Sequence, residues 1–239
     1  MQIAIVLYRG FTALDVLGPY EFLKYLPNAE IRFVSHEVGP VATDRGVLVV
    51  GATHTYAETP RPDFVMIPGS EAKTAVAAAD KRLTEWLRGV ECHASYITSV
   101  CSGAIVLGAA GLLRGLPATT HWAAMDALKV FGADVRPEER VVNAGKIWTA
   151  AGVTAGMDLA LAVIGTVAGD NTAQKIQLMI EYDPQPPYDM GHMAKASPDV
   201  EHDARKEIAR LSRNPSTVIA VAKLGWQKIL RKARATASR

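Results

Sequence analysis

Short apolar runs alternate with helical patterns along most of this chain, and this alternation limits the fold more than any other feature. The first run, Ile3–Tyr8, is rich in β-branched residues and apolar throughout, as in a parallel strand buried on both faces. Further strands are predicted at Ala29–Ser35, Phe64–Ile67 and Tyr96–Val100. The sequence therefore predicts an α/β fold in which a doubly wound, mainly parallel sheet is flanked by helices.

Helical patterns fill the segments between and after these strands. Helices are predicted at Asp15–Leu26, Ala72–Ala79, Lys81–Cys92, Ala104–Leu113, Thr154–Val167 and Thr172–Tyr182. Gly18-Pro19 leaves two starts open for the first helix, at Asp15 or at Pro19. Leu48–Thr53 is predicted as part of a hairpin or an edge strand. A strand pair is predicted at Val141–Asn143 and Ile147–Ala150.

The 239 residues divide into an α/β domain over residues 1–194 and a helical extension over residues 195–239. The extension carries two predicted helices, Val200–Arg213 and Ser216–Ala233, with Asn214-Pro215 as N-cap and first helical residue. Each helix has an apolar stripe, so we expect the extension to pack on its own domain or on a dimer partner. The stripes are Val200, Ala204, Ile208 and Leu211, then Val218, Ile219, Ala222, Trp226, Ile229 and Leu230.

The net charge of +2 hides a basic extension, in which Lys195–Arg239 hold 11 Lys and Arg against 4 Asp and Glu. A basic tail can bind nucleic acid, or it can be the solvated face of a helix; the apolar periodicity favours the second interpretation, and no nucleic-acid partner is expected. No apolar run is long enough to cross a bilayer, and the N-terminus reads as a strand, not a signal peptide. We expect no membrane association and a cytoplasmic protein with reduced thiols.

Cys101 follows a predicted strand directly and precedes a predicted helix, in the stretch "YITSVCSGAIVLG". Such a thiol is either an inert buried side chain or a nucleophile exposed on a sharp turn. The position favours the nucleophile, because the N-terminus of a helix is expected to lower the pKa of a thiol. Gly103 would let the backbone pack closely behind the turn. Cys92 lies within a helical pattern and is expected to be inert; the two cysteines form no metal-ligand spacing.

Asp15 and Gly69-Ser70 also follow predicted strands. If these strands neighbour the one before Cys101, all three strand ends share one crevice. Asp15 could exchange protons with the thiol, with a pKa raised by burial, or could serve as a helix N-cap. The backbone N–H groups of Gly69, Ser70 and Ser102 are candidates for an oxyanion pocket.

Two further titratable residues are candidates for supporting roles. Glu21 is a second candidate acid, or else a solvated residue on a helix face. His121, in "TTHW", could pair with Cys101 as the base of a cysteine hydrolase, or could be a structural histidine.

The segments "LDVLGPYEFL", "DFVMIPGS", "ITSVCSGAIVLGAAGLLRG", "ATTHW" and "TAAGVTAGMDLAL" occur here in one order. In that order they resemble the ThiJ/PfpI superfamily, with its flavodoxin-like, class I glutamine-amidotransferase-like fold, from residue 1 to about residue 180. Within the superfamily the chain is most similar to the isocyanide (isonitrile) hydratases. That similarity rests on Asp15 three residues before Gly-Pro, on "SVCSGA", on "AAGLLRG" and on "QLMIEYDPQPPYD".

The resemblance implies a homodimer without a cofactor that hydrates an isocyanide to an N-substituted formamide. It implies that Cys101 attacks the isocyanide carbon to form a thioimidate and that Asp15 moves the protons. Ser102 matches the position after the nucleophile, which is often Thr in the hydratases. Val153 matches a position close to the turn that holds the nucleophile.

The sequence departs from the family pattern at Ser70, because the family usually has two glycines where this chain has Gly69-Ser70. Ser70 would be strained if that position requires a positive φ. No histidine follows Cys101, which argues against the protease-like branch. Two alternatives stay open: another cysteine-dependent activity, glyoxalase-type or amidase, and a ligand-sensing regulatory domain. Known regulators of that kind carry paired helix-turn-helix units, for which two terminal helices are too few.

Overall fold

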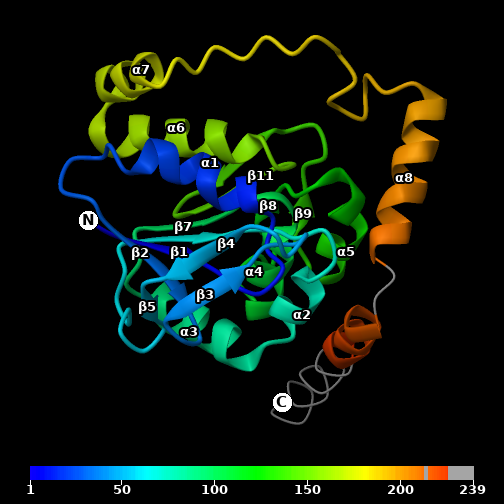
Figure 1. The fold of residues 1–239 in the computed structure, drawn as a ribbon, viewed down its shortest axis with the longest axis horizontal. Helices are drawn as coiled ribbons and strands as arrows, with labels where there is room; N and C mark the ends of the chain where they lie inside the picture. Colours follow the sequence, from blue (N-terminus) through cyan, green and yellow to red (C-terminus); the bar gives the residue numbers. More distant parts are fainter. Residues whose placement is uncertain (213–214, 226–239) are drawn as a thin grey trace.

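The computed structural model describes residues 1–212 and 215–225, and its central sheet has the predicted parallel character (Figure 1). Within these residues the sheet comprises β1 (Gln2–Val6), β2 (Glu30–Ser35), β5 (His54–Thr55), β6 (Phe64–Ile67), β7 (Tyr96–Ser99), β10 (Val141–Ala144) and β11 (Ile147–Ala150). The strand order is β10-β11-β7-β6-β1-β2-β5. All neighbours pair in parallel except β10, which runs antiparallel to β11.

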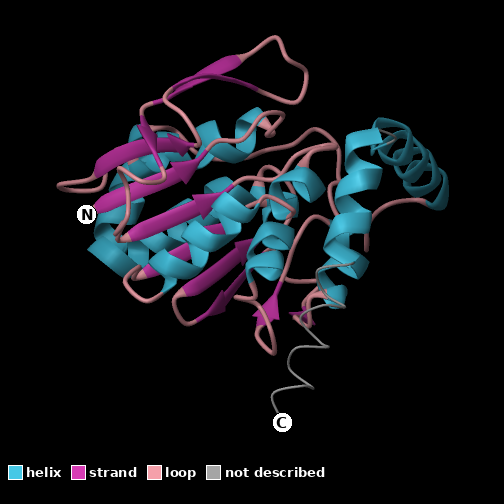
Figure 2. Cartoon of the chain, turned by 90° about the horizontal axis from the view of Figure 1, so that it is seen from below, coloured by secondary structure: helices cyan, strands magenta, loops and turns pink. Residues whose placement is uncertain are grey.

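Helices cover both faces of the sheet, as Figure 2 shows from below. One face carries α1 (Ala13–Leu23), α6 (Ala155–Ala168) and α7 (Asp170–Met179); the other carries α2 (Thr74–Ala78), α3 (Lys81–Glu91) and α4 (Ala104–Ala110), with α5 (Met125–Val130) beside α4 (Figure 1). This cover explains why β6 is buried at every residue. The predicted doubly wound α/β fold is confirmed.

The order of the strands reverses between β1 and β6, because the chain proceeds from β1 to β2 on one side and from β6 to β7 on the other. In open α/β sheets the carboxyl ends of the strands at such a reversal form a crevice. The three strand ends singled out in the sequence are those of β1, β6 and β7, which are consecutive neighbours. The condition for a shared crevice is therefore met.

The first helix begins earlier than either predicted start. Thr12 is the N-cap of α1, and Pro19 lies inside the helix. Asp15 thus sits in the first turn, and the interpretation of its carboxylate as the N-cap is wrong. Pro19 lacks an N–H and cannot bond the carbonyl of Asp15 four residues earlier, so α1 tolerates one missing backbone bond beside the crevice.

The remaining strands are short. The predicted hairpin around Leu48–Thr53 is present: β3 (Gly39–Ala42) pairs antiparallel with β4 (Val49–Ala52), apart from the central sheet. Its first strand was not predicted, because Gly39 and Pro40 are poor strand formers. A two-residue parallel pair joins β8 (Pro117–Ala118) to β9 (Asp134–Val135).

The C-terminal extension consists of α8 (Pro198–Ser212) and a helical stretch over residues 215–225, reached by the linker 183–197, which crosses the outside of the body (Figure 1). Of the first predicted stripe, Ala204, Ile208 and Leu211 are half-buried and Val200 is exposed. Of the second stripe, Val218, Ile219 and Ala222 are exposed, because Ala220 and Leu224, on another face of this stretch, meet the body instead. Asn214, Trp226, Ile229 and Leu230 lie outside the described residues.

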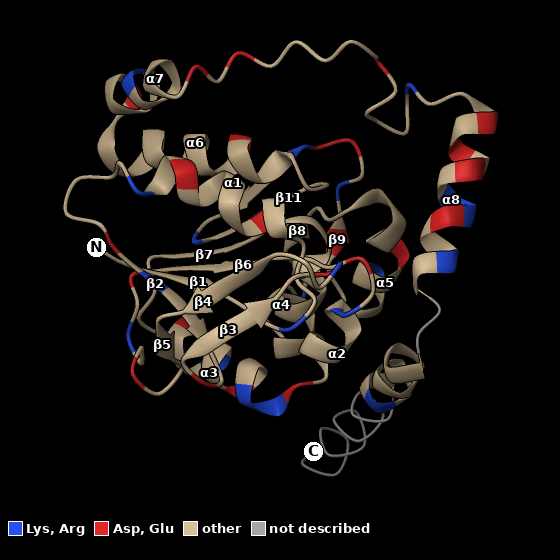
Figure 3. Cartoon of the chain, in the orientation of Figure 1, with Lys and Arg blue, Asp and Glu red and all other residues tan. Residues whose placement is uncertain are grey.

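Among the described residues, no helix combines the length and apolarity needed to cross a membrane. Figure 3 shows stretches of ribbon belonging to acidic and to basic residues along α8, so the described part of the extension mixes both signs of charge. The described residues also contain no cluster of three or more His, Cys, Asp or Glu side chains able to hold a metal ion.

Candidate active site

Cys101 sits on a strained turn between β7 and α4. Its φ is +56°, a conformation that costs a non-glycine residue about 1–2 kcal/mol. Two hydrogen bonds hold it there: its N–H donates to the carbonyl of Ala151 (2.8 Å), and Thr120 Oγ1 donates to its carbonyl (2.8 Å). An observed strain of this kind, fixed on both sides by the fold, is characteristic of functional positions.

Two glycines allow the turn to approach its neighbours. A Cβ on Gly103 would lie 2.3 Å from the carbonyl oxygen of Ile67, at the end of β6. A Cβ on Gly69 would lie 2.6 Å from the Ser102 nitrogen and 2.9 Å from Cys101 Cβ. Both glycines are required by close contact and not by backbone conformation, since neither has a positive φ. The predicted role of Gly103 behind the turn therefore has a direct steric basis.

Asp15 and Cys101 face each other in the crevice. Asp15 is fully buried; one carboxyl oxygen, Oδ2, accepts the Gly69 N–H (2.7 Å), while Oδ1 has no conventional hydrogen-bond partner. Burial raises the pKa of Asp15 to about 8 and outweighs the opposing effect of the Gly69 N–H. The raised pKa expected for this carboxyl is therefore found, and it suits a group that exchanges protons near neutral pH.

The pKa of the Cys101 thiol differs from the expectation. Burial is the largest influence on it and, together with the Asp15 carboxyl, raises the pKa of Cys101 above its ordinary value. The backbone N–H and the hydroxyl of Ser102 act in the opposite direction without reversing it. The predicted lowering of the pKa by the helix N-terminus is wrong for this structure, because only 6% of Cys101 is exposed to water.

The predicted oxyanion pocket is not formed by free donors. The Gly69 N–H is bonded to Asp15, and the Ser70 N–H donates to Ser102 Oγ (3.1 Å). Gly69 and Ser70 therefore position the acid and the neighbouring hydroxyl, which corrects their assignment as substrate donors. Ser70 has no positive φ, so the strain that a second glycine would have relieved is absent.

Thr74 is a site residue that the sequence interpretation missed. Its hydroxyl, at the start of α2, lies 2.6 Å from Ser102 Oγ and 3.3 Å from the carbonyl of Ser70. It is 7% exposed. The signal in the sequence was a threonine four residues after Ser70, at a helix start; that spacing turns its hydroxyl back toward the preceding strand end.

The three supporting candidates have different outcomes. His121 and Val153 line the same cavity as Cys101. His121 packs against Gly152, accepts the Ala123 N–H (3.3 Å) and has its pKa lowered by burial. Glu21 is exposed on α1 and paired with Lys24, so its candidacy as a second acid is wrong.

The cavity that contains Cys101 has a volume of about 420 Å³, within the usual range for small-molecule sites, roughly 300–1,000 Å³. Cys101, Ser102 and Thr74 line one part of it. Ile208 and Leu211 of α8 line another part, and Thr217 of the stretch 215–225 also contributes. Sequence patterns do not predict that the extension reaches this cavity, because contacts between segments a hundred residues apart leave no periodicity.

Comparison with known proteins gives relatives of this chain in sequence and in structure. It is 39% identical to the isonitrile hydratase of Pseudomonas putida over 209 residues, 87% of this chain and 90% of that protein. A solved ThiJ/PfpI family protein from Pseudomonas syringae superposes with a TM-score of 0.85 at 37% identity, covering 92% of this chain and 90% of that one.

A regulator also shows similarity. The chain is 30% identical to the HTH-type transcriptional regulator CdhR of Pseudomonas aeruginosa over 145 residues, which are 60% of this chain and 42% of that protein. The model of the DJ-1/PfpI family matches residues 1–166. With its strained cysteine turn, its sheet order and these relatives, the chain belongs to the DJ-1/PfpI family.

Proposed function

We propose that this protein hydrates isocyanides, converting R–N≡C and water into the formamide R–NH–CHO. The observation that carries the proposal is the pairing of Cys101, whose thiol lines the cavity, with Asp15, a proton-exchanging acid buried beside that thiol. The terminal carbon of an isocyanide must gain both a bond to sulfur and a proton, and the pair can supply both. The similarity to the isonitrile hydratase of Pseudomonas putida supports this reaction.

The first half-reaction joins Cys101 to the substrate. With a pKa of about 8, roughly a tenth of Asp15 is ionised at pH 7. The ionised carboxylate accepts the thiol proton as the sulfur bonds to the terminal carbon, and it then gives that proton to the same carbon. The product is a thioimidate, R–N=CH–S–Cys101, with Asp15 again ionised.

Water completes the second half-reaction. Asp15 accepts a proton from the attacking water, whose oxygen bonds to the thioimidate carbon, and Asp15 then gives that proton to the nitrogen. The carbon–sulfur bond then breaks as the hydroxyl proton passes to the sulfur. The formamide leaves and Cys101 is again a thiol, so one water is consumed in each turnover.

An amidase reaction fits this site less well. Amide hydrolysis develops an oxyanion in its first step and requires free donors directed at that oxygen. The N–H groups of Gly69 and Ser70 are already bonded to Asp15 and Ser102. Attack on an isocyanide carbon develops no oxyanion in the first step, so this arrangement suffices.

A substrate panel tests the proposal, with an aryl isocyanide compared against methylglyoxal and a simple amide. We expect hydration of the isocyanide, its loss in Cys101→Ala, and a fall in kcat/KM of about 10²–10⁴-fold in Asp15→Asn. Faster turnover of methylglyoxal would favour a glyoxalase-type activity. Isocyanide hydration that survives Cys101→Ala would remove the thiol from the mechanism.

A homodimer is also proposed. Support comes from large apolar side chains that the isolated chain leaves in water on α7 and in the linker after it. Leu178 is 81% exposed and Tyr188 is 83% exposed, with Met179 and Met190 nearby in the sequence and half exposed or more. Apolar side chains grouped in this way are typical of surfaces that meet another protein.

A further inference from the structure

The C-terminal extension contributes one wall of the cavity that contains Cys101. Ile208, Leu211 and Ser212 from α8, and Thr217 from the following helical stretch, are lining residues. All four lie beyond residue 166, where the match to the family model ends. The part of the chain that the family model matches supplies the thiol and the acid, and the extension supplies this wall.

The chemistry of the lining is apolar and almost free of charge. Besides Ile208 and Leu211, the lining contains small side chains, namely Ala72, Ala75, Ala123, Ala124 and Ala127. Alanines leave room for a substituent, and the two branched side chains limit that room. Glu71 is the single ionised side chain of the described lining, which includes no lysine or arginine.

Polar contacts between described residues help to fasten the extension to the body. Thr217 Oγ1 donates to the Ala72 carbonyl (2.5 Å), and Lys73 Nζ donates to Ser216 Oγ (2.8 Å). The guanidinium of Arg205 lies 5.0 Å from the centre of the Trp122 ring. No residue of α8 is fully buried, so its pocket-facing side chains can be changed without disturbing the core of the sheet.

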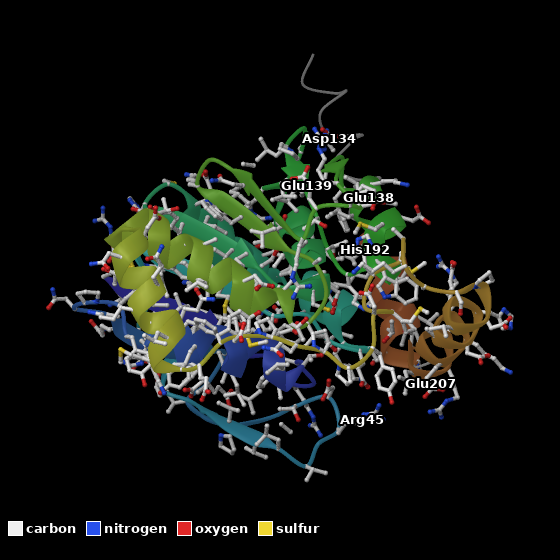
Figure 4. The ribbon with its side chains drawn as sticks, turned by 90° about the horizontal axis from the view of Figure 1, so that it is seen from above. Arg45, Asp134, Glu138, Glu139, His192 and Glu207 are labelled. Carbon is white, nitrogen blue, oxygen red and sulfur yellow. The ribbon has the colours of Figure 1, made fainter. Side chains whose placement is uncertain are left out.

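Charged contacts add to this attachment, and Figure 4 labels four of the residues involved: Arg45, Glu138, His192 and Glu207. His192 of the linker lies 4.0 Å from Glu138 of the body. Glu207 of α8 has its pKa lowered first by its bond to Arg210 and also by Arg45, from the loop between β3 and β4. Arg45 in turn contacts Glu71 (3.1 Å) at the edge of the cavity.

We propose that Ile208 and Leu211 of α8 are specificity-determining residues that select substrates with uncharged, apolar substituents. The assignment of these substrates as isocyanides rests on the proposed function. The selection by α8 does not rest on it, because that selection follows from the residues that line the cavity. A substituent with a negative charge is disfavoured because the described lining contains no lysine or arginine to pair with it. A large apolar substituent gains contact with both branched side chains.

Alkylation of Cys101 tests the selection without any turnover. In the Cys92→Ser variant, we measure the rates at which iodoacetamide, iodoacetate and N-benzyl-iodoacetamide alkylate Cys101. Each rate is divided by the rate at which the same reagent alkylates the exposed Cys92 in the Cys101→Ala variant, which corrects for the intrinsic reactivity of the reagent. We expect the benzyl reagent to be favoured and iodoacetate to be disfavoured at Cys101. Leu211→Ala should reduce the benzyl preference about tenfold, and Leu211→Lys should raise the relative rate of iodoacetate about tenfold.

Val200 provides the matched control, because it is an apolar residue of the same helix that is 45% exposed and does not line the cavity. Val200→Ala and Val200→Lys should leave the three relative rates within twofold of the parent. If substitutions at positions 200 and 211 changed the relative alkylation rates of Cys101 equally, the proposal would be overturned. A benzyl preference unchanged in Leu211→Ala would also overturn it.

Turnover separates this proposal from the proposed function. For isocyanides, ethyl isocyanoacetate should be hydrated much faster than isocyanoacetate, and Leu211→Lys should narrow the difference. If no isocyanide is hydrated while the alkylation pattern is as expected, the proposed hydratase function is wrong and the proposed selection by α8 is supported. If isocyanides are hydrated at rates that depend neither on the charge of the substrate nor on residue 211, the proposed selection by α8 is wrong and the hydratase function is supported.

Discussion

The buried carboxyl of Asp15 links the acidity of the site to the stability of the fold. Folding raises its pKa from about 4 to about 8, so the folded state holds the proton more tightly than the unfolded state does. Between these two values the unfolded chain ionises at Asp15 while the folded chain does not. The contribution of Asp15 to the free energy of unfolding therefore decreases as the pH rises from 4 to 8.

Asp15→Asn should remove this pH-dependent cost, because an amide oxygen can still accept the Gly69 N–H. We expect the variant to exceed the parent in free energy of unfolding by on the order of 5 kcal/mol at pH 8, and by little at pH 4. Urea unfolding of both proteins at the two pH values measures the effect. A difference that is the same at pH 4 and pH 8 would contradict the raised pKa.

Thr74 acts on the thiol through Ser102. Ser102 Oγ has one hydrogen to donate and accepts the Ser70 N–H (3.1 Å). When Thr74 donates its own hydrogen across their 2.6 Å contact, the hydrogen of Ser102 is left for either the Ser70 carbonyl (3.3 Å) or the Cys101 sulfur. We therefore propose Thr74 as a positioning residue for the Cys101 sulfur, acting through Ser102.

Thr74→Val should raise the pKa of Cys101 and slow its alkylation, because a shape-preserving substitution removes the hydrogen that Ser102 accepts. We expect an upward displacement of about 0.5–1 pH unit in the pH profile of alkylation by iodoacetamide. Thr74→Ser, which keeps the hydroxyl, should restore the profile of the parent. If Thr74→Ser and Thr74→Val gave the same profile, packing and not hydrogen bonding would explain the contact.

The turn between β7 and α4 depends on contact at Gly103. A methyl group there would lie 2.3 Å from a backbone oxygen of β6, and backbone cannot move aside as a flexible side chain can. Gly103→Ala should therefore destabilise the protein by about 3 kcal/mol or more. Thermal unfolding measures this.

Gly89 offers a control inside α3, since a Cβ there meets no atom within 4 Å. Gly89→Ala should stabilise the protein by about 0.5–1 kcal/mol, because alanine is the better helix former. If Gly→Ala stabilises the protein at position 89 and destabilises it at position 103, the effect at Gly103 arises from the contact with β6. A mild Gly103→Ala variant that kept Cys101 reactive would show that the turn can shift.

The elements around the site could be predicted from sequence because their signals are local. A short apolar run ending in Cys101-Ser102-Gly103, and another ending in Gly69, identify strand ends without knowledge of their neighbours. The use of the N–H groups of Gly69 and Ser70 could not be predicted, since it depends on which side chain the fold brings opposite each of them. The pKa of Cys101 was mispredicted for the same reason: burial is a property of the assembled crevice.

The whole molecule leaves apolar side chains on α7 and in its linker that a second copy can cover. We expect a dimer in sedimentation-velocity experiments at micromolar concentration, and a shift toward monomer in Leu178→Glu. Val47→Glu in the loop between β3 and β4 is the control, since Val47 is also exposed, at 90%, but lies in another part of the chain. A monomeric parent, or dissociation caused equally by both variants, would count against this interface.

The separation between the catalytic pair and the wall formed by α8 has a consequence for divergence among relatives. In the proposed mechanism the residues that make and break bonds are Asp15 on α1 and Cys101 on the turn after β7. Ile208 and Leu211 belong instead to α8, which one linker joins to the body and in which no residue is fully buried. Mutations in that segment, or its replacement by recombination, can therefore alter which molecules are accepted without endangering the reaction. Relatives that keep the same reaction can therefore acquire new substrate ranges through changes in this C-terminal segment.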